Sequence, residues 1–207
     1  TSYSCSIRGG FGSSIAMNVM VYVTLALGTI IGLVHTFGGL PKLCSAKNTH
    51  AFAKVYVVFL GCPGLGTPLR IVIALGEVSA GVAILVGIWA DAFDYFEEDM
   101  SNLAKCLVIV AGVALMNLAF VASFMHCYID GAGKACFPGA MAVISLMFVL
   151  VRTFGVEPAS WEHQMLCMGL CTIMLIITGI TVIINKTMGV HESLVKDDNE
   201  DPVMGGC

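Results

Sequence analysis

Residues 13–37 read SSIAMNVMVYVTLALGTIIGLVHTF and contain no formal charge. As an α-helix this run is about 37 Å long at 1.5 Å per residue, which is enough to cross the roughly 30 Å hydrocarbon core of a bilayer with some tilt. A soluble core disperses its apolar residues periodically, whereas a bilayer requires uninterrupted runs of about 20. The run therefore predicts a membrane-spanning helix.

The composition of the whole chain agrees with this prediction. Of its 207 residues, 57% are hydrophobic and only 12% are charged, and the mean hydropathy is +0.90. So few charges cannot form a water-soluble surface, so a soluble domain is excluded. The formal charge of -4 and the lack of a basic groove with aromatics also argue against nucleic acid as a partner.

Four further runs have the same character. Residues 136–151 form the shortest, which spans either in a thinned region or with extension at Ala135 and Thr153. The predicted spans are 13–37, 70–89, 103–125, 136–151 and 165–184. We therefore expect an all-α integral membrane bundle of about five transmembrane helices. This transmembrane domain, residues 13–186, lies between an N-terminal segment, residues 1–12, and a polar tail, residues 187–207.

The segments between the runs are predicted as loops. Residues 38–69 are rich in Gly and Pro, and within them residues 49–60 fit a short helix along the membrane interface. Residues 91–99 hold five carboxylates beside Phe93, Tyr95 and Phe96, which indicates a solvated acidic turn with interfacial aromatics.

Five spans place the two termini on opposite faces of the membrane, so the basic residues can be assigned to faces. One face carries Arg8, Lys105 and Arg152, and the other carries Lys42, Lys47, Lys54, Arg70, Lys134, Lys186 and Lys196. The positive-inside rule places the second group, with the C-terminus, on the cytosolic, stromal or matrix side. The chain starts at Thr1, and its Ser-rich beginning resembles the remnant of a targeting segment. We therefore expect an organellar location, in the thylakoid or the mitochondrial inner membrane.

Glu77 is the residue that packing explains least well, because a carboxylate inside a span costs about 2.5 to 3.5 kcal/mol on insertion scales. It is expected to face protein and to bond to a polar partner. Such an orientation also turns Ala74 and Gly81 inward. Arg70 lies two turns earlier on the same helical face, where a direct pair is strained and a bridging partner fits better.

Several polar residues near the membrane face of Arg70 predict a ligand-binding site. The alternative interpretation is that they form buried structural hydrogen bonds. The candidate cofactor-binding residues are His35, Arg70, Glu77, Asn117 and His126, with Lys42 beside them. Such a cluster suits a quinone headgroup, a lipid phosphate or a pigment such as chlorophyll or a carotenoid. The sequence holds no standard catalytic motif and no metal-type C-x-x-C pair. Neither a catalytic residue nor a metal ligand is therefore predicted.

Small residues at four-residue spacing predict faces where helices approach closely, since lipid supplies no hydrophobic drive for helix association. These residues are Thr24, Gly28, Gly32, Gly76, Ala80, Ala83 and Gly87. Of the nine cysteines, those within the runs are read as small hydrophobes. Disulfides between Cys44 and Cys62, or between Cys127 and Cys136, stay possible, although the charge count places these loops on the reducing side of the membrane.

Residues 28–151 resemble the DoxX-like family of small four-helix membrane proteins. The resemblance lies in residues 36–43, TFGGLPKL, similar to the family's G-x-x-K-L, and in residues 70–81, RIVIALGEVSAG, similar to its A-L-x-E-x-x-x-G. It implies a quinone-linked oxidoreductase subunit, a partner of redox enzymes or an assembly chaperone. A light-harvesting antenna protein would carry Asn or His three residues after Glu77 and Arg five residues after it, and Ala80 and Val82 stand there instead.

These observations together favour a non-catalytic accessory subunit of a large energy-transducing membrane complex, photosynthetic or respiratory. It would contact the lipid bilayer, other membrane-protein subunits and bound lipid or pigment. The alternatives are a DoxX-like, quinone-linked oxidoreductase subunit that uses Glu77 and Arg70, and an assembly chaperone for membrane proteins.

Overall fold

The computed structural model is all-helical in the part of the chain that it describes. That part comprises residues 11–44, 66–93, 95, 98–129 and 131–156, with eight helical positions between residues 165 and 180. The elements are α1 (Phe11–Cys44), α4 (Gly66–Ala92), α5 (Glu98–Ile129), α6 (Ala132–Val151) and a π-helical turn η3 (Arg152–Val156).

Among the described residues, four helices are long and apolar enough to cross a membrane. Their candidate spans are Val19–Cys44, Thr67–Ala92, Leu103–Cys127 and Ala132–Phe154. The shortest has 23 residues, about 34 Å of helix, so each exceeds the roughly 30 Å of bilayer hydrocarbon. The four corresponding runs are therefore confirmed as long apolar helices, and the short fourth run gains its length by extension at both ends.

Two helices extend into residues 38–69, which were predicted as a loop. The first helix continues through Pro41 to Cys44, and the second begins at Gly66 rather than at Arg70. A proline in the last turn removes only one backbone hydrogen bond, and Pro68 lies in a first turn, where its missing N–H has no intrahelical partner anyway. The predicted fifth span, 165–184, and the predicted interfacial helix, 49–60, lie largely or wholly outside the described residues.

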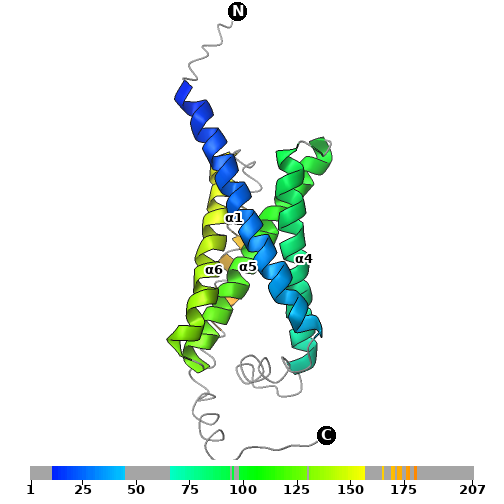
Figure 1. Cartoon of the computed structure of the whole chain (residues 1–207), viewed down its shortest axis with the longest axis vertical. Helices are drawn as coiled ribbons and strands as arrows, with labels where there is room; N and C mark the ends of the chain where they lie inside the picture. The colour runs from blue at the N-terminus through cyan, green and yellow to red at the C-terminus, as the bar shows by residue number, and fades with distance from the viewer. Residues whose placement is uncertain are drawn as a thin grey trace, which may run out of the picture.

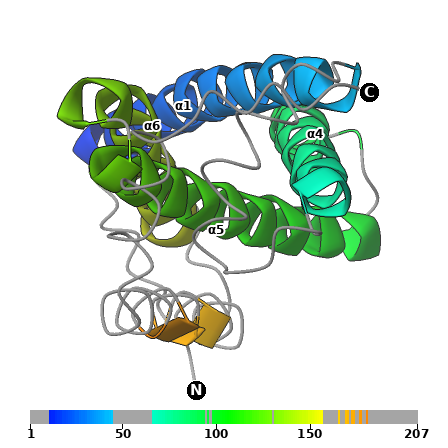
Figure 2. The same ribbon diagram turned by 90° about the horizontal axis from the view of Figure 1, so that it is seen from below.

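The four helices run alternately up and down and form a ring. Each helix packs on the next along the chain, and α6 returns to pack on α1, so that α1 and α4 make one hairpin while α5 and α6 make the other. We call the end where α1 and α5 finish the Lys42 end and the opposite end the Asp91 end. The two hairpins cross near the middle of the bundle and lie apart at the Lys42 end (Figures 1 and 2).

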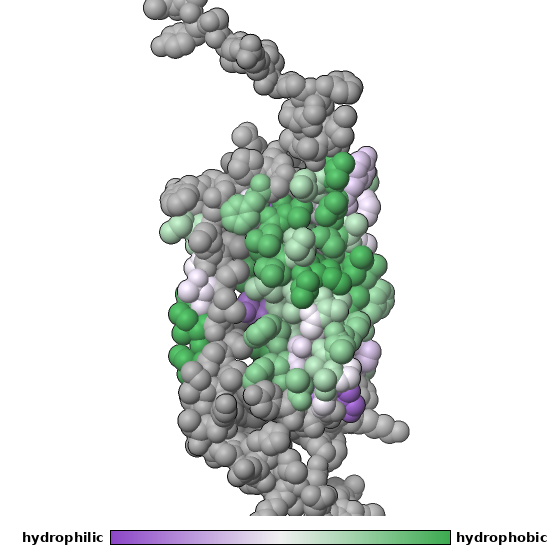
Figure 3. Space-filling model, turned by 90° about the vertical axis from the view of Figure 1, so that its left-hand side faces the viewer, coloured by the Kyte–Doolittle hydropathy of each residue, from purple (hydrophilic) through white to green (hydrophobic). Residues whose placement is uncertain are grey.

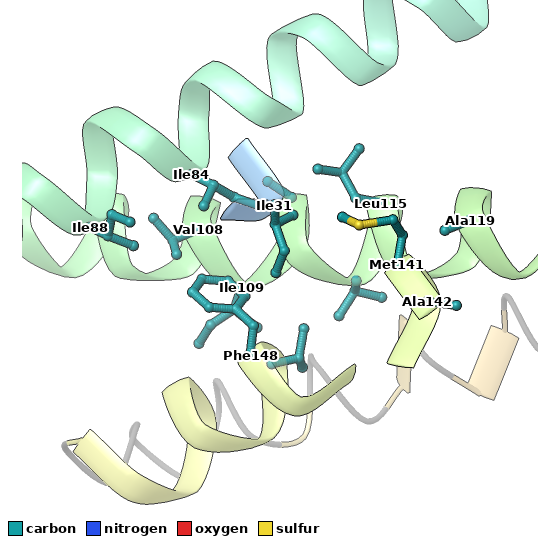
Figure 4. Packing of buried hydrophobic residues seen from close by; sticks show 13 residues of the cluster. Ile31, Ile84, Ile88, Val108, Ile109, Leu115, Ala119, Met141, Ala142 and Phe148 are labelled. Atoms are coloured by element: carbon teal, nitrogen blue, oxygen red, sulfur yellow. The ribbon is translucent and has the colours of Figure 1, made fainter. Parts of the chain in front are cut away.

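The apolar core joins all four helices (Figure 4). Ile31 of α1, Ile84 of α4, Val108 of α5 and Phe148 of α6 are each no more than 1% exposed. A Cβ at Gly28 would lie 2.8 Å from both an Ile88 and a Phe148 side-chain atom, so the glycine lets α1 settle on this cluster. This cluster therefore holds the two hairpins together between the middle of the bundle and the Asp91 end.

The outward faces of the helices carry large hydrophobic side chains. Examples are Tyr22 of α1, Val72 of α4, Leu107 of α5 and Val143 of α6, all more than half exposed. Hydrophobic residues cover much of the coloured surface in Figure 3. A monomeric soluble protein rarely exposes apolar area on this scale, whereas a lipid-facing surface requires it.

Candidate functional site: the polar interior at the Lys42 end

An ion pair joins α1 to α4 inside the bundle. Lys42 Nζ donates to both carboxylate oxygens of Glu77 at 2.6 Å, and the Glu77 side chain is only 8% exposed. The prediction that Glu77 faces protein and bonds to a polar partner is confirmed. Its partner exists because α1 continues through the residues predicted as a loop and carries Lys42 to the depth of the carboxylate.

Close packing of the two backbones positions this pair. A Cβ at Gly39 would lie 2.7 Å from Val78 Cγ2 and 3.1 Å from Ala74 O, so a side chain there would press α1 away from α4. Ala74 and Gly81 are both buried, as the inward orientation of Glu77 predicts. At Gly32 an added Cβ would lie 2.9 Å from Gly81 O, which marks the closest crossing of α1 and α4.

Two more of the predicted site residues lie buried on inward faces of the same helices. Arg70, seven residues before Glu77 on α4, is 7% exposed. His35, seven residues before Lys42 on α1, is also 7% exposed, and its Nε2 has no hydrogen-bond partner. Seven residues are almost two full turns, so each of these residues shares a helical face with one member of the ion pair.

Asn117 and His126 belong to the other hairpin. Asn117 is 1% exposed and donates from Nδ2 to Val113 O within α5 at 2.8 Å. Gly87 of α4 lies against Val108 of α5, so counting along antiparallel helices places Asn117 near the depth of Glu77, and His126 near that of Arg70. Asn117 and His126 thus lie on the opposite hairpin at about the depths of Glu77 and Arg70. A direct bond is established for Glu77 with Lys42.

A second charged cluster, which the sequence analysis did not predict as a site, lies at the Asp91 end. Arg152 Nη2 donates to Asp91 Oδ2 at 2.5 Å, and Lys105 Nζ lies 3.8 Å from Asp91 Oδ1. The prediction of a solvated acidic turn was therefore wrong for Asp91, which ties α4 to α5 and η3. The exposed Phe93 and Tyr95 do fit interfacial aromatics. The sequence signal for this cluster was the position of Arg152 directly after an apolar run, because a buried cation requires a carboxylate partner.

The small-residue prediction is confirmed in part. Gly28, Gly32 and Gly87 all lie at helix contacts, whereas Gly76 is exposed and a Cβ there would have nothing within 4 Å. Gly76 faces away from the bundle, so the contact predicted there is not made with the described helices and stays a prediction.

The cysteines at the Lys42 end do not pair in the structure. Cys44, Cys127 and Cys136 are free and exposed, so the open possibility of a Cys127–Cys136 disulfide is not realised. Cys62, the other possible partner of Cys44, lies outside the described residues. Among the described residues, no group of three or more His, Cys, Asp or Glu side chains is placed to hold a metal ion.

Comparison with known proteins gives no relative for this chain: no family model, no curated protein and no solved structure matches it. Function must therefore be argued from the arrangement of the side chains. The interior at the Lys42 end offers the cations Arg70 and Lys42, the carboxylate of Glu77 and the imidazole of His35, which can donate or accept a hydrogen bond. This set can hold a polar or anionic group.

Proposed function

We propose that the chain is a non-catalytic accessory subunit of a larger membrane complex, stabilising assembly through its outward helix faces. The observation that carries the proposal is the outward face of α4, where Gly76 and Ser79 are both exposed and nothing lies within 4 Å of a Cβ at Gly76. A glycine gains nothing from contact with lipid, whereas it lets the helix of another subunit approach closely.

The internal ion pairs support the same function. Glu77 is bonded by Lys42, and Asp91 by Arg152, so these charges hold the helices of the bundle to one another. An accessory subunit needs a rigid scaffold of this kind, because a preformed surface loses little conformational entropy when a partner binds.

We place the complex in an organelle and expect it to be a photosystem or a respiratory complex. Lys42, Arg70 and Lys134 at one end of the bundle, against Lys105 and Arg152 at the other, favour the Lys42 end as the stromal or matrix side. A chlorophyll absorption spectrum of the purified complex separates the photosynthetic from the respiratory assignment.

The experiment is purification in mild detergent followed by native mass spectrometry. We expect the chain to run with a stoichiometric partner, and Gly76→Leu to lower the yield of that partner several-fold. Val143→Leu is the matched control, because Val143 is an exposed residue on α6 that is already bulky, so leucine there closes no small-residue contact face. A chain that runs alone contradicts the proposal, and partner loss from both variants equally contradicts the assignment of the α4 face.

A DoxX-like quinone-linked oxidoreductase subunit is the second candidate. The buried Arg70 and the unpartnered His35 Nε2, at the same end of the bundle as the buried Glu77, favour it because the carbonyl oxygens of a quinone headgroup accept hydrogen bonds from such donors. This function requires that Glu77→Gln lower the rate of electron transfer to a quinone in the native membrane. An unchanged rate rejects it.

A further inference from the structure

The depth order of the polar groups at the Lys42 end matches one class of ligand. Lys42 lies near the end of α1, and Arg70 lies in the second turn of α4, so both cations are near the membrane surface. His35 lies seven residues, or about 10 Å of helix, deeper than Lys42. Deeper still, the interior is the apolar cluster around Ile31 and Ile84.

A phosphoglyceride presents its chemical groups in the same order. Its phosphate lies at the surface, its ester carbonyls lie deeper, and its acyl chains continue into hydrocarbon. Cations recognise phosphate, and a buried N–H donor recognises a carbonyl oxygen. These groups all belong to the hairpin of α1 and α4, which lies apart from the hairpin of α5 and α6 at this end of the bundle (Figures 1 and 2).

We propose that the bundle interior at the Lys42 end binds one anionic phospholipid, whose phosphate lies against Arg70 and Lys42 and whose ester carbonyl accepts a hydrogen bond from His35 Nε2. The independent observation behind the proposal is that this Nε2 is buried in the structure with no hydrogen-bond partner. A buried donor or acceptor without a partner is destabilising, so a partner that the ligand supplies accounts for its presence.

Glu77 gives this site a distinctive behaviour. In the structure its carboxylate holds Lys42 Nζ at 2.6 Å, so it competes with a phosphate for the same ammonium group. Removing the negative charge of Glu77 frees Lys42 for the ligand. A residue that served stability alone would weaken lipid binding when replaced, whereas a competitor strengthens it.

Lipid binding is measured by titrating the purified full chain in mixed micelles with phosphatidylglycerol and, separately, with phosphatidylcholine. We expect preference for phosphatidylglycerol, with about tenfold weaker binding for Arg70→Gln and for His35→Phe, the loss of one good hydrogen bond to a charged or buried group. Glu77→Gln is expected to bind several-fold more tightly. Lys134→Gln is the matched control, an exposed cation at the same end whose loss should leave binding unchanged.

Inorganic phosphate distinguishes the lipid from a free anion, because it has no ester carbonyl. We expect it to compete weakly, with a dissociation constant that His35→Phe does not change. Circular dichroism confirms that each variant is folded before its binding is compared. Equal binding of the two lipids, wild-type affinity in both Arg70→Gln and His35→Phe, or weaker binding in Glu77→Gln overturns the proposal. Co-purification of a partner subunit is a separate measurement, so this site can fail while the proposed function stands.

Discussion

Replacing Gly32 by alanine tests the closest crossing of α1 and α4. The new Cβ would lie 2.5 Å from Leu85 Cγ and 2.9 Å from Gly81 O, well inside the 3.5 to 4.0 Å of an ordinary carbon contact. The leucine can change rotamer, but Gly81 O belongs to a helix backbone, so the two helices must separate. Overpacking of this kind costs about 1 to 3 kcal/mol.

Gly38→Ala on the same helix is the matched control, because nothing lies within 4 Å of its Cβ position. Both substitutions gain the same helix propensity, up to about 1 kcal/mol. The difference between the two variants therefore isolates the clash. We expect Gly32→Ala to be about 1 to 3 kcal/mol less stable than Gly38→Ala when helix content is followed during unfolding in mixed micelles of mild detergent and dodecyl sulfate. Equal free energies of unfolding would refute the close crossing.

Three further predictions concern buried polar groups. Lys42→Met should lower the free energy of unfolding by about 3 kcal/mol, because it strands the buried Glu77 carboxylate. The double variant with Glu77→Met should recover most of that loss, and a double-mutant cycle showing no coupling contradicts the ion pair. Arg152→Met should lower the free energy of unfolding by less, about 1 to 2 kcal/mol, since Lys105 still faces Asp91. The same unfolding measurement in mixed micelles tests this, and an unchanged free energy would contradict a stabilising Asp91–Arg152 pair. Ser145→Ala should keep or raise stability by up to about 1 kcal/mol, because its buried Oγ has no hydrogen-bond partner; a clear loss of stability would show that the hydroxyl is bonded.

Four of the helices could be predicted because a bilayer imposes long runs without charge. Their ends could not, since Gly38, Gly39 and Pro41 are typical of loops in soluble proteins. In α1 these residues continue the helix: Gly39 lets α1 pack closely on α4 beside Glu77, and a proline in the last turn costs one hydrogen bond. Lys42 was predicted near the polar cluster but in a loop, so its direct bond to Glu77 could not be predicted.

The orientation of Glu77 could be predicted from the cost of a charge in hydrocarbon, and the burial of Ala74 and Gly81 followed from helical periodicity. The Asp91–Arg152 pair could not be predicted in the same way. Its members are 61 residues apart, and the pairing depends on how α4 and α6 pack around α5. Periodicity fixes the face of one helix and carries no information about which two faces meet.

The central claim is that the four helices cross a membrane alternately, which single cysteines in sealed vesicles can test. The native Cys44 and a Lys134→Cys variant lie at the Lys42 end, and a Tyr95→Cys variant lies at the Asp91 end; all three positions are exposed. Each is placed alone in a chain whose other cysteines are replaced and is treated with a membrane-impermeant maleimide. We predict that Cys44 and Lys134→Cys are labelled from one side of the membrane and Tyr95→Cys only from the other. Labelling of all three from the same side would contradict the account.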